Sequence, residues 1–154
     1  MSSGLAQSAQ VRLVRHAKAI DADPNLVFAR YAAERLLYRL SRSAHAERFV
    51  LKGAMLLVAW LGENIRPTRD MDLLGPSELG ADVLADVVRD VFDTDVEPDG
   101  LVFDPASVRI EPIRADGAFG GWRVLCVARL GSARIRTQVD IGIGDLVSPE
   151  PEWL

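Results

Sequence analysis

Apolar residues recur at helical spacing in the first part of this chain and at every second position in its last part. This pattern predicts helices followed by strands. Apolar residues recur at helical spacing over residues 5–17 and 26–41, with a break at 21–24. A third helix is expected over residues 79–92, after a cap at Gly75-Pro76-Ser77. The apolar face of this helix is expected to carry Leu79, Val83, Val87 and Val91.

Alternation with a period of two predicts three strands, near residues 108–113, 122–130 and 135–143, with Gly131-Ser132 as a tight turn between the last two. One face of the last strand is apolar and consists of Ile135, Thr137, Val139, Ile141 and Ile143. The acidic segment 93–100 has proline where a calcium loop needs glycine, so we expect a turn-rich loop there. The predicted fold class is α+β, a small mixed sheet with helices mainly on one face and N-terminal helices ahead of it.

The motif with the clearest chemical content is Asp70-Met71-Asp72. Residues i and i+2 of a strand point to the same face, so the two carboxylates would stand side by side while Met71 and Leu73 face the core. Such carboxylates repel each other unless a cation lies between them, and Mg²⁺ is bound by one or two carboxylates together with substrate phosphates. A solvated pair of acids at a strand end is the alternative interpretation.

The segment before this motif is a candidate phosphate site. Residues 49–51 are β-prone, Lys52-Gly53 is a break, and residues 54–61 are apolar and favour a helix. In a strand, turn and helix of this kind, glycine lets a phosphate approach the backbone, and the helix N-terminus offers N–H groups. Lys52 adds a positive charge. A buried turn whose glycine serves geometry alone is the alternative.

Asp140 is the third candidate acid, because it lies on the polar face of the last predicted strand. If that strand lies beside the strand of Asp70 and Asp72, three carboxylates converge, enough for two metal ions or for one metal ion and a general base. Without that adjacency, Asp140 is a solvent-facing residue of a sheet surface.

The order of these predicted elements resembles that of the polymerase-β-like nucleotidyltransferase superfamily: a glycine turn, a helix, a D-x-D strand and a later strand with one acid. More specifically, four segments together resemble the AbiEii family, nucleotidyltransferase toxins of bacterial toxin–antitoxin systems that include the mycobacterial MenT proteins. These segments are residues 30–41, 49–54, 66–72 and 139–145. The resemblance extends from about residue 25 to the end of the chain.

The resemblance implies one polymerase-β-like nucleotidyltransferase domain over residues 1–154, with N-terminal helices in 1–45, a catalytic core in 46–154, and the family's C-terminal helical part absent. It implies an enzyme that transfers a nucleotide from a nucleoside triphosphate (NTP) to an acceptor, the tRNA 3′ end in characterised relatives. The implied protein partner is a cognate antitoxin. The alternative is a truncated, non-catalytic remnant or half-domain that only binds an antitoxin or a complementing partner.

The resemblance also implies roles for individual residues. Asp70, Asp72 and Asp140 would hold Mg²⁺ or Mn²⁺, and Asp140 would share a metal ion or help to deprotonate the attacking hydroxyl. The phosphate-binding residues would be Lys52, Gly53, Ala54 and Arg66. Thr68 lies two residues before the metal pair, and its phosphorylation would place negative charge beside carboxylates that must bind Mg²⁺.

Length and composition indicate a single domain without a membrane span. A chain of 154 residues fits one domain with a real core. We expect a cytoplasmic protein, since no apolar run approaches the roughly 18 residues of a membrane span and the N-terminus lacks the order of a signal peptide. Cys126, the single cysteine, is expected in the core.

Basic residues gather in the first third of the chain, although the net charge is −4. Residues 1–52 hold nine Lys or Arg against four acids, +5, and the remainder holds nine against eighteen, −9. The candidates for an RNA-binding helix face are Arg30, Arg35, Arg39, Arg42 and Arg48. The alternative, which we favour, is an ordinary solvated face of an amphipathic helix.

Overall fold

The computed structural model describes residues 3–52, 70–115 and 117–143, and it describes only the backbone of Ser3, Leu51, Lys52, Asp70 and Ala115. Helices α1 (Ser3–Ala19) and α2 (Pro24–Arg42) come first, as predicted, and helix α4 (Ala81–Phe92) follows later. The break before α2 has a local cause. The Asp23 carboxylate accepts a hydrogen bond of 2.9 Å from the Asn25 N–H, and Pro24 occupies the first turn.

Six described strands form one mixed sheet: β1 (Val50–Lys52), β2 (Asp70–Gly75), β3 (Leu101–Phe103), β4 (Arg109–Ala115), β5 (Ala118–Leu130) and β6 (Ala133–Ile143). Their order is β1-β2-β6-β5-β3, and β4 pairs with β5 as well. β2 and β6 are parallel, and the other described pairs are antiparallel. Short 3₁₀ turns, η1 (Ala46–Arg48) and η3 (Pro105–Ser107), connect elements.

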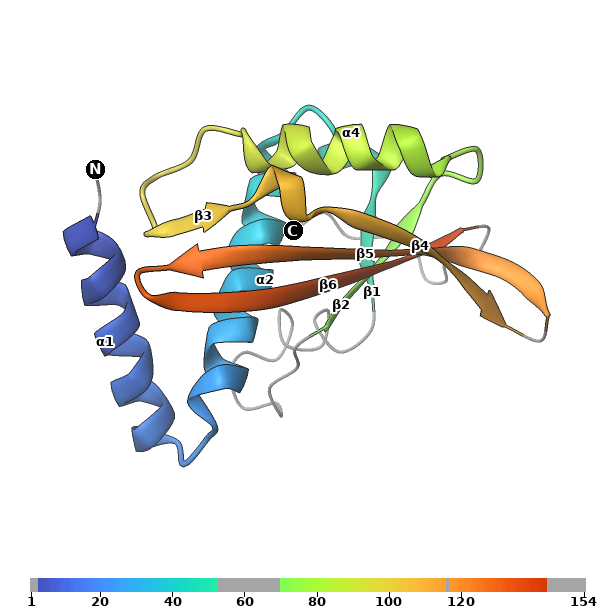
Figure 1. Cartoon of the computed structure of the whole chain (residues 1–154). Helices are drawn as coiled ribbons and strands as arrows, with labels where there is room; N and C mark the ends of the chain where they lie inside the picture. The colour runs from blue at the N-terminus through green and yellow to red at the C-terminus, as the bar shows by residue number, and fades with distance from the viewer. Residues whose placement is uncertain (1–2, 53–69, 116, 144–154) are drawn as a thin grey trace.

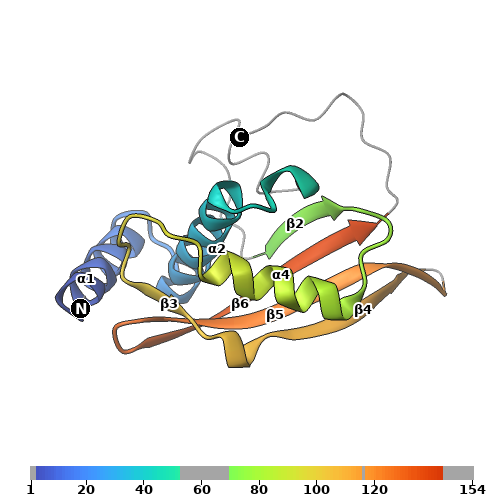
Figure 2. The same cartoon turned by 90° about the horizontal axis from the view of Figure 1, so that it is seen from above.

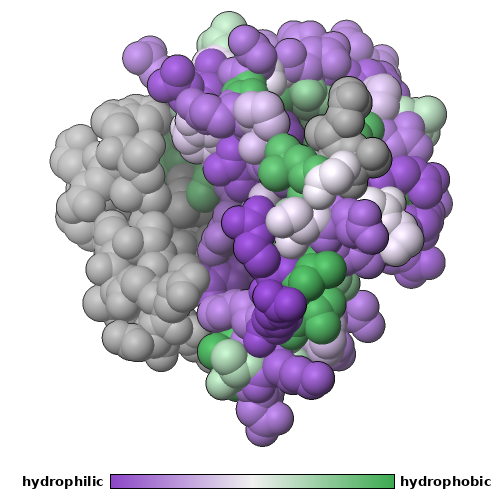
Figure 3. All heavy atoms as spheres, turned by 90° about the vertical axis from the view of Figure 1, so that its left-hand side faces the viewer, coloured by the Kyte–Doolittle hydropathy of each residue, from purple (hydrophilic) through white to green (hydrophobic). Residues whose placement is uncertain are grey.

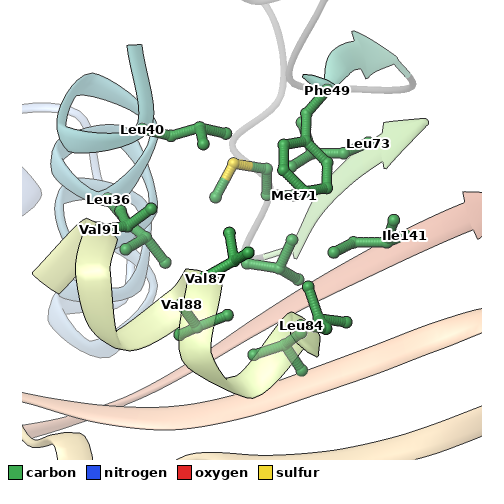
Figure 4. A pocket seen from close by; sticks show the side chains of 12 residues that line it. Leu36, Leu40, Phe49, Met71, Leu73, Leu84, Val87, Val88, Val91 and Ile141 are labelled. Atoms are coloured by element: carbon green, nitrogen blue, oxygen red, sulfur yellow. The ribbon is translucent and has the colours of Figure 1, made fainter. Parts of the chain in front are cut away.

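Helices α2 and α4 lie on the same face of the sheet (Figures 1 and 2). The core lies between them and the strands, where side chains from α2, α4, β2 and β6 point toward one another around a cavity of about 40 Å³ (Figure 4). Met71 and Leu73 are buried, as their alternation with the acids predicts. Val139 and Ile141 of β6 are buried beside them. The α+β class with helices on one face of a mixed sheet is therefore confirmed.

Two details of α4 differ from the prediction. The residue before the helix is Gly80, which makes no side-chain hydrogen bond, so the proposed cap at Gly75-Pro76-Ser77 is wrong. The buried face of α4 carries Leu84, Val87 and Val91, whereas Val83 is 52% exposed. The helix begins at Ala81, so Leu79 lies before it and does not indicate which helix face is buried. The residues that face the core are spaced i, i+3 and i+7 from Leu84.

β3 was not predicted, because three residues are too short for an alternation to be recognised. The hairpin at Gly131-Ser132 is confirmed, since Leu130 pairs with Ala133 and Gly131 has a φ of 59°. Cys126 is buried as expected, and its burial raises the pKa of the thiol to about 12.

Three of the five arginines considered for an RNA-binding face have carboxylate partners. Arg39 makes two hydrogen bonds, of 2.8 and 3.0 Å, to the carboxylate of Asp99, and Arg35 donates a third of 2.8 Å. Arg30 pairs instead with Glu34 of its own helix. The face of α2 at Arg35 and Arg39 therefore anchors the acidic loop at Asp99, whereas Arg42 and Arg48 are exposed, as the solvated-face alternative expects.

The surface seen from the α1 side is mostly hydrophilic, with apolar side chains in separate areas (Figure 3). Exposed apolar residues of this region include Val11, Val14 and Ile20. None of the described helices is both long and apolar enough to cross a lipid bilayer.

Candidate functional site

The candidate acids meet where β2 and β6 run parallel. Asp72 is the Cα partner of Asp140, and Asp70 is the partner of Gln138. Neighbouring strands lie about 4.8 Å apart, and residues opposite each other project from the same face. The expected adjacency of the two strands is therefore confirmed, and the described side chains of Asp72 and Asp140 are both half-buried on the face opposite the helices.

A row of charged residues crosses the sheet at this level. Lys52 of β1 pairs with Asp72, Asp72 pairs with Asp140, Asp140 pairs with Arg123 of β5, and Arg123 pairs with Glu111 of β4. The signs along the row are therefore plus, minus, minus, plus, minus. Asp72 and Asp140 are therefore adjacent acids in this row, and two like charges side by side favour a cation between them.

The Asp140 carboxylate has a firm partner in Arg123. The arginine donates from Nε to Oδ1 at 2.9 Å and from Nη2 to Oδ2 at 3.1 Å. Gln138 adds a longer contact of 3.4 Å from Nε2 to Oδ1. The side chain of Arg123 is 41% exposed and that of Asp140 is 24% exposed, so a ligand can reach the ion pair. The fork geometry fixes the orientation of Asp140.

Arg123 is the site residue that the sequence analysis missed. It lies on the polar face of a strand that was correctly predicted, opposite Asp140 across the Gly131-Ser132 hairpin. Counting outward from that turn pairs residue 130 with 133 and residue 123 with 140. The signal was therefore present in the hairpin register, because the turn position fixes which residue lies opposite Asp140.

Several predicted site residues lie outside the described part of the structure. They are Gly53, Ala54, Arg66 and Thr68. The predicted helix over residues 54–61 lies there as well. For Lys52 and Asp70 the structure places the backbone, in β1 and β2 respectively. Their roles remain predictions.

The described residues fit a hard cation in the type of their donors. Asp72 and Asp140 carry carboxylates on the same face of two adjacent strands, and carboxylate oxygens are ligands that Mg²⁺ prefers. Within the described residues no group of three His, Cys, Asp or Glu gathers as a complete metal site. Asp70, two residues before Asp72 on the same strand, occupies the position from which a third oxygen ligand would come.

Comparison with known proteins identifies the family of this chain. Residues 35–154 match the family model described as nucleotidyl transferase AbiEii toxin, type IV TA (toxin–antitoxin) system. The match includes β2, β6 and the row of charges between β1 and β4. A search of curated proteins found no match. Since the family model covers most of the chain, this protein belongs to the AbiEii family of nucleotidyl transferase toxins of type IV toxin–antitoxin systems.

Proposed function

We propose that this protein is a divalent-cation-dependent nucleotidyltransferase that moves a nucleotide from an NTP to the 3′ end of a tRNA and releases pyrophosphate. Family membership supplies the reaction class. The observation that carries the proposal is the register of Asp72 with Asp140, because it brings two oxygen ligands, 68 positions apart, onto adjacent strands. We expect the protein to act in the cytoplasm, where both substrates are found.

Each acid has a proposed role. Asp70, Asp72 and Asp140 would hold Mg²⁺ or Mn²⁺. When bound, the cation would supply positive charge to the triphosphate and to the attacking and leaving oxygens of an in-line displacement. A carboxylate oxygen of Asp140 would accept the proton of the acceptor hydroxyl. Arg123 would keep that carboxylate oriented, since its two N–H donors already hold both oxygens.

The triphosphate would lie toward β1. Lys52, Gly53, Ala54 and Arg66 would bind its phosphates through two positive charges and backbone N–H groups. The support for Lys52 is positional, because its backbone pairs directly with that of Asp72. Phosphates bound there would lie beside the cation that the acids hold.

The test is a transfer assay with the whole chain, Mg²⁺ or Mn²⁺, tRNA and each of the four labelled NTPs in turn. Asp72→Asn and Asp140→Asn should each reduce labelling of the tRNA by more than about 100-fold, since even partners outside the direct ligand set cost 10–100-fold. Asp86→Asn is the matched control, because Asp86 is an exposed acid on α4, on the other face of the sheet. Circular dichroism checks that every variant is folded.

Two results would point away from this proposal. Equal labelling by Asp140→Asn and by the Asp86→Asn control would remove Asp140 from the site. The non-catalytic half-domain would be favoured by a combination of three results. The unmodified chain would label no tRNA, would not bind Mn²⁺ and would bind a cognate antitoxin tightly. The antitoxin itself is a proposed partner on the basis of the family description.

We also propose that phosphorylation of Thr68 switches the enzyme off. Thr68 precedes Asp70 by two positions, and a phosphate there would bring nearly two negative charges toward carboxylates that must bind a cation. Thr68→Glu should therefore weaken Mn²⁺ binding and transfer, whereas Thr68→Val should change both little. A Thr68→Glu protein with full transferase activity would remove the proposal.

A further inference from the structure

The face of the sheet that carries Asp140 also carries all four arginines of β5 and β6. Arg129 pairs with Arg134 and Arg136 pairs with Val127, so all three arginines share the face on which Arg123 meets Asp140. Arg109 joins them, because it is the partner of Leu125 on that face. We call Arg109, Arg129, Arg134 and Arg136 the arginine track. The described helices pack on the opposite face (Figure 2).

The charge along this face is graded. β5 contains no acidic residue, and β6 contains one, Asp140. All four residues of the arginine track are exposed, and none has a carboxylate partner within the described residues. Arg134 lies six positions before Asp140, which is about 20 Å along a strand. Positive charge therefore extends from the acids toward the hairpin end for a distance that suits a short run of nucleotides.

The face is also hollowed between η3 and the hairpin. A depression of about 640 Å³ is lined by Ser107, Arg109, Leu125, Arg134, Arg136 and Gln138, among others. Its lining combines guanidinium groups, a hydroxyl, an amide and apolar surface. A single-stranded nucleic acid needs this combination, since its phosphates bind cations and its bases lie on apolar or guanidinium surfaces.

We propose that the arginine track binds the single-stranded 3′ segment of the RNA acceptor and leads its terminal hydroxyl to Asp140. This inference rests on the proposed function and adds the surface that holds the acceptor. Arg109, Arg134 and Arg136 would contact phosphates along the depression, and Arg129 would contact one at the hairpin end. Arg123 stands between the track and the acids, already engaged with Asp140.

The geometry favours RNA over an acidic protein segment. The basic residues form a line that ends at the two adjacent acids, so a bound polyanion has one end at the place where the proposed chemistry occurs. A protein partner gains nothing from ending there. Charge complementarity alone would allow either RNA or an acidic protein segment to bind, so an acidic peptide is included as a competitor.

The experiment measures binding of a fluorescently labelled single-stranded RNA with a free 3′ hydroxyl to the whole chain, by anisotropy over a range of salt concentrations. Arg134→Gln combined with Arg136→Gln should weaken binding and reduce the slope of log K against log salt by ~1–2, close to one for each lost phosphate contact. The control is Arg15→Gln combined with Arg42→Gln. It removes the same charge from exposed positions on α1 and α2 and should behave as the unmodified chain.

The outcomes separate this inference from the proposed function. Asp72→Asn and Asp140→Asn should still bind the RNA while losing transfer. If the unmodified chain binds RNA through the arginine track but transfers no nucleotide, the track stands and the transferase proposal fails. Equal RNA affinity for the 134/136 variant and the 15/42 control would overturn the track. Displacement of the RNA by an equally charged glutamate peptide at a lower concentration would also overturn it, in favour of a protein-binding face.

Discussion

At the scale of single residues, Arg123 has the clearest untested role. Its guanidinium orients Asp140 but also places positive charge beside a proposed cation site. Arg123→Gln should therefore tighten Mn²⁺ binding severalfold by removing that charge, and should lower transfer by about 10–100-fold by releasing Asp140. Arg123→Lys should keep the weaker Mn²⁺ affinity and recover part of the transfer. A purely structural arginine would instead lower both quantities together in the Gln variant.

Gly121 is the residue at which backbone geometry allows least change. Its φ is 149°, and a Cβ there would collide with the carbonyl oxygen of Ile141 on the neighbouring strand. We expect Gly121→Ala to lower the free energy of unfolding by about 3 kcal/mol, combining strain and the displacement of β6. Gly120→Ala is the matched control, because its Cβ would meet nothing closer than 3.6 Å. Urea denaturation of both variants measures the difference, and equal stabilities would contradict the prediction.

At the scale of elements, the phase of α4 can be tested with two adjacent residues. Leu84 is fully buried and Val83 is 52% exposed. Leu84→Ala should cost about 2–5 kcal/mol of stability, whereas Val83→Ala should change it by no more than about 0.5 kcal/mol. Thermal or urea unfolding of the two variants decides the matter. The reverse order would restore the helix face that the sequence periodicity first predicted.

The connection between α2 and the acidic loop depends on Asp99. Burial alone would raise the pKa of its carboxyl, but hydrogen bonds from Arg39, Arg35 and the Leu101 N–H outweigh burial and lower the pKa. A carboxyl with a lowered folded-state pKa stabilises the fold above its unfolded value of about 3.9 and loses that contribution as pH falls through the folded pKa.

Asp99→Asn should therefore destabilise the protein by about 3–5 kcal/mol at neutral pH, because it leaves two arginines partly buried without their carboxylate. The difference from the unmodified chain should shrink below about pH 4. Urea unfolding between pH 3 and 7 measures this difference. Asp95→Asn, in the same loop, is the control, and a pH-independent difference would contradict the ion-pair explanation.

At the scale of the whole molecule, the sequence predicted the elements well and their mutual placement less well. Burial in β6 follows the alternation of residues 135–143, and the strand near Asp70 was placed through its apolar partners. The sequence does not predict that β2 and β6 lie side by side, because pairing between strands so distant in the chain leaves no local signal. Their adjacency is therefore only an assumption of the predicted metal site. The anchoring of Asp99 by α2 was missed for the same reason.

A cation held by β2 and β6 should stabilise the whole fold. A ligand that binds only the folded state adds RT ln(1 + [L]/Kd), about 2.7 kcal/mol at a hundredfold excess over Kd. Mn²⁺ should therefore raise the Tm of the unmodified chain and leave that of the Asp72→Asn, Asp140→Asn double variant unchanged. Ca²⁺ and ionic-strength controls separate site binding from general screening. The same increase in both proteins would place the cation elsewhere.

The parallel pairing of β2 with β6 has a consequence for how activity arises during folding. The β5–β6 hairpin joins residues close in the chain, whereas the β2–β6 pairing joins residues far apart, and contacts of high sequence separation are slow to close. We therefore expect the hairpin to form first and β6 to pair with β2 late. Helices and local turns can form well before that step. A partly folded chain would thus lack the paired acids, and the capacity to harm a cell would appear only when assembly of the sheet is complete.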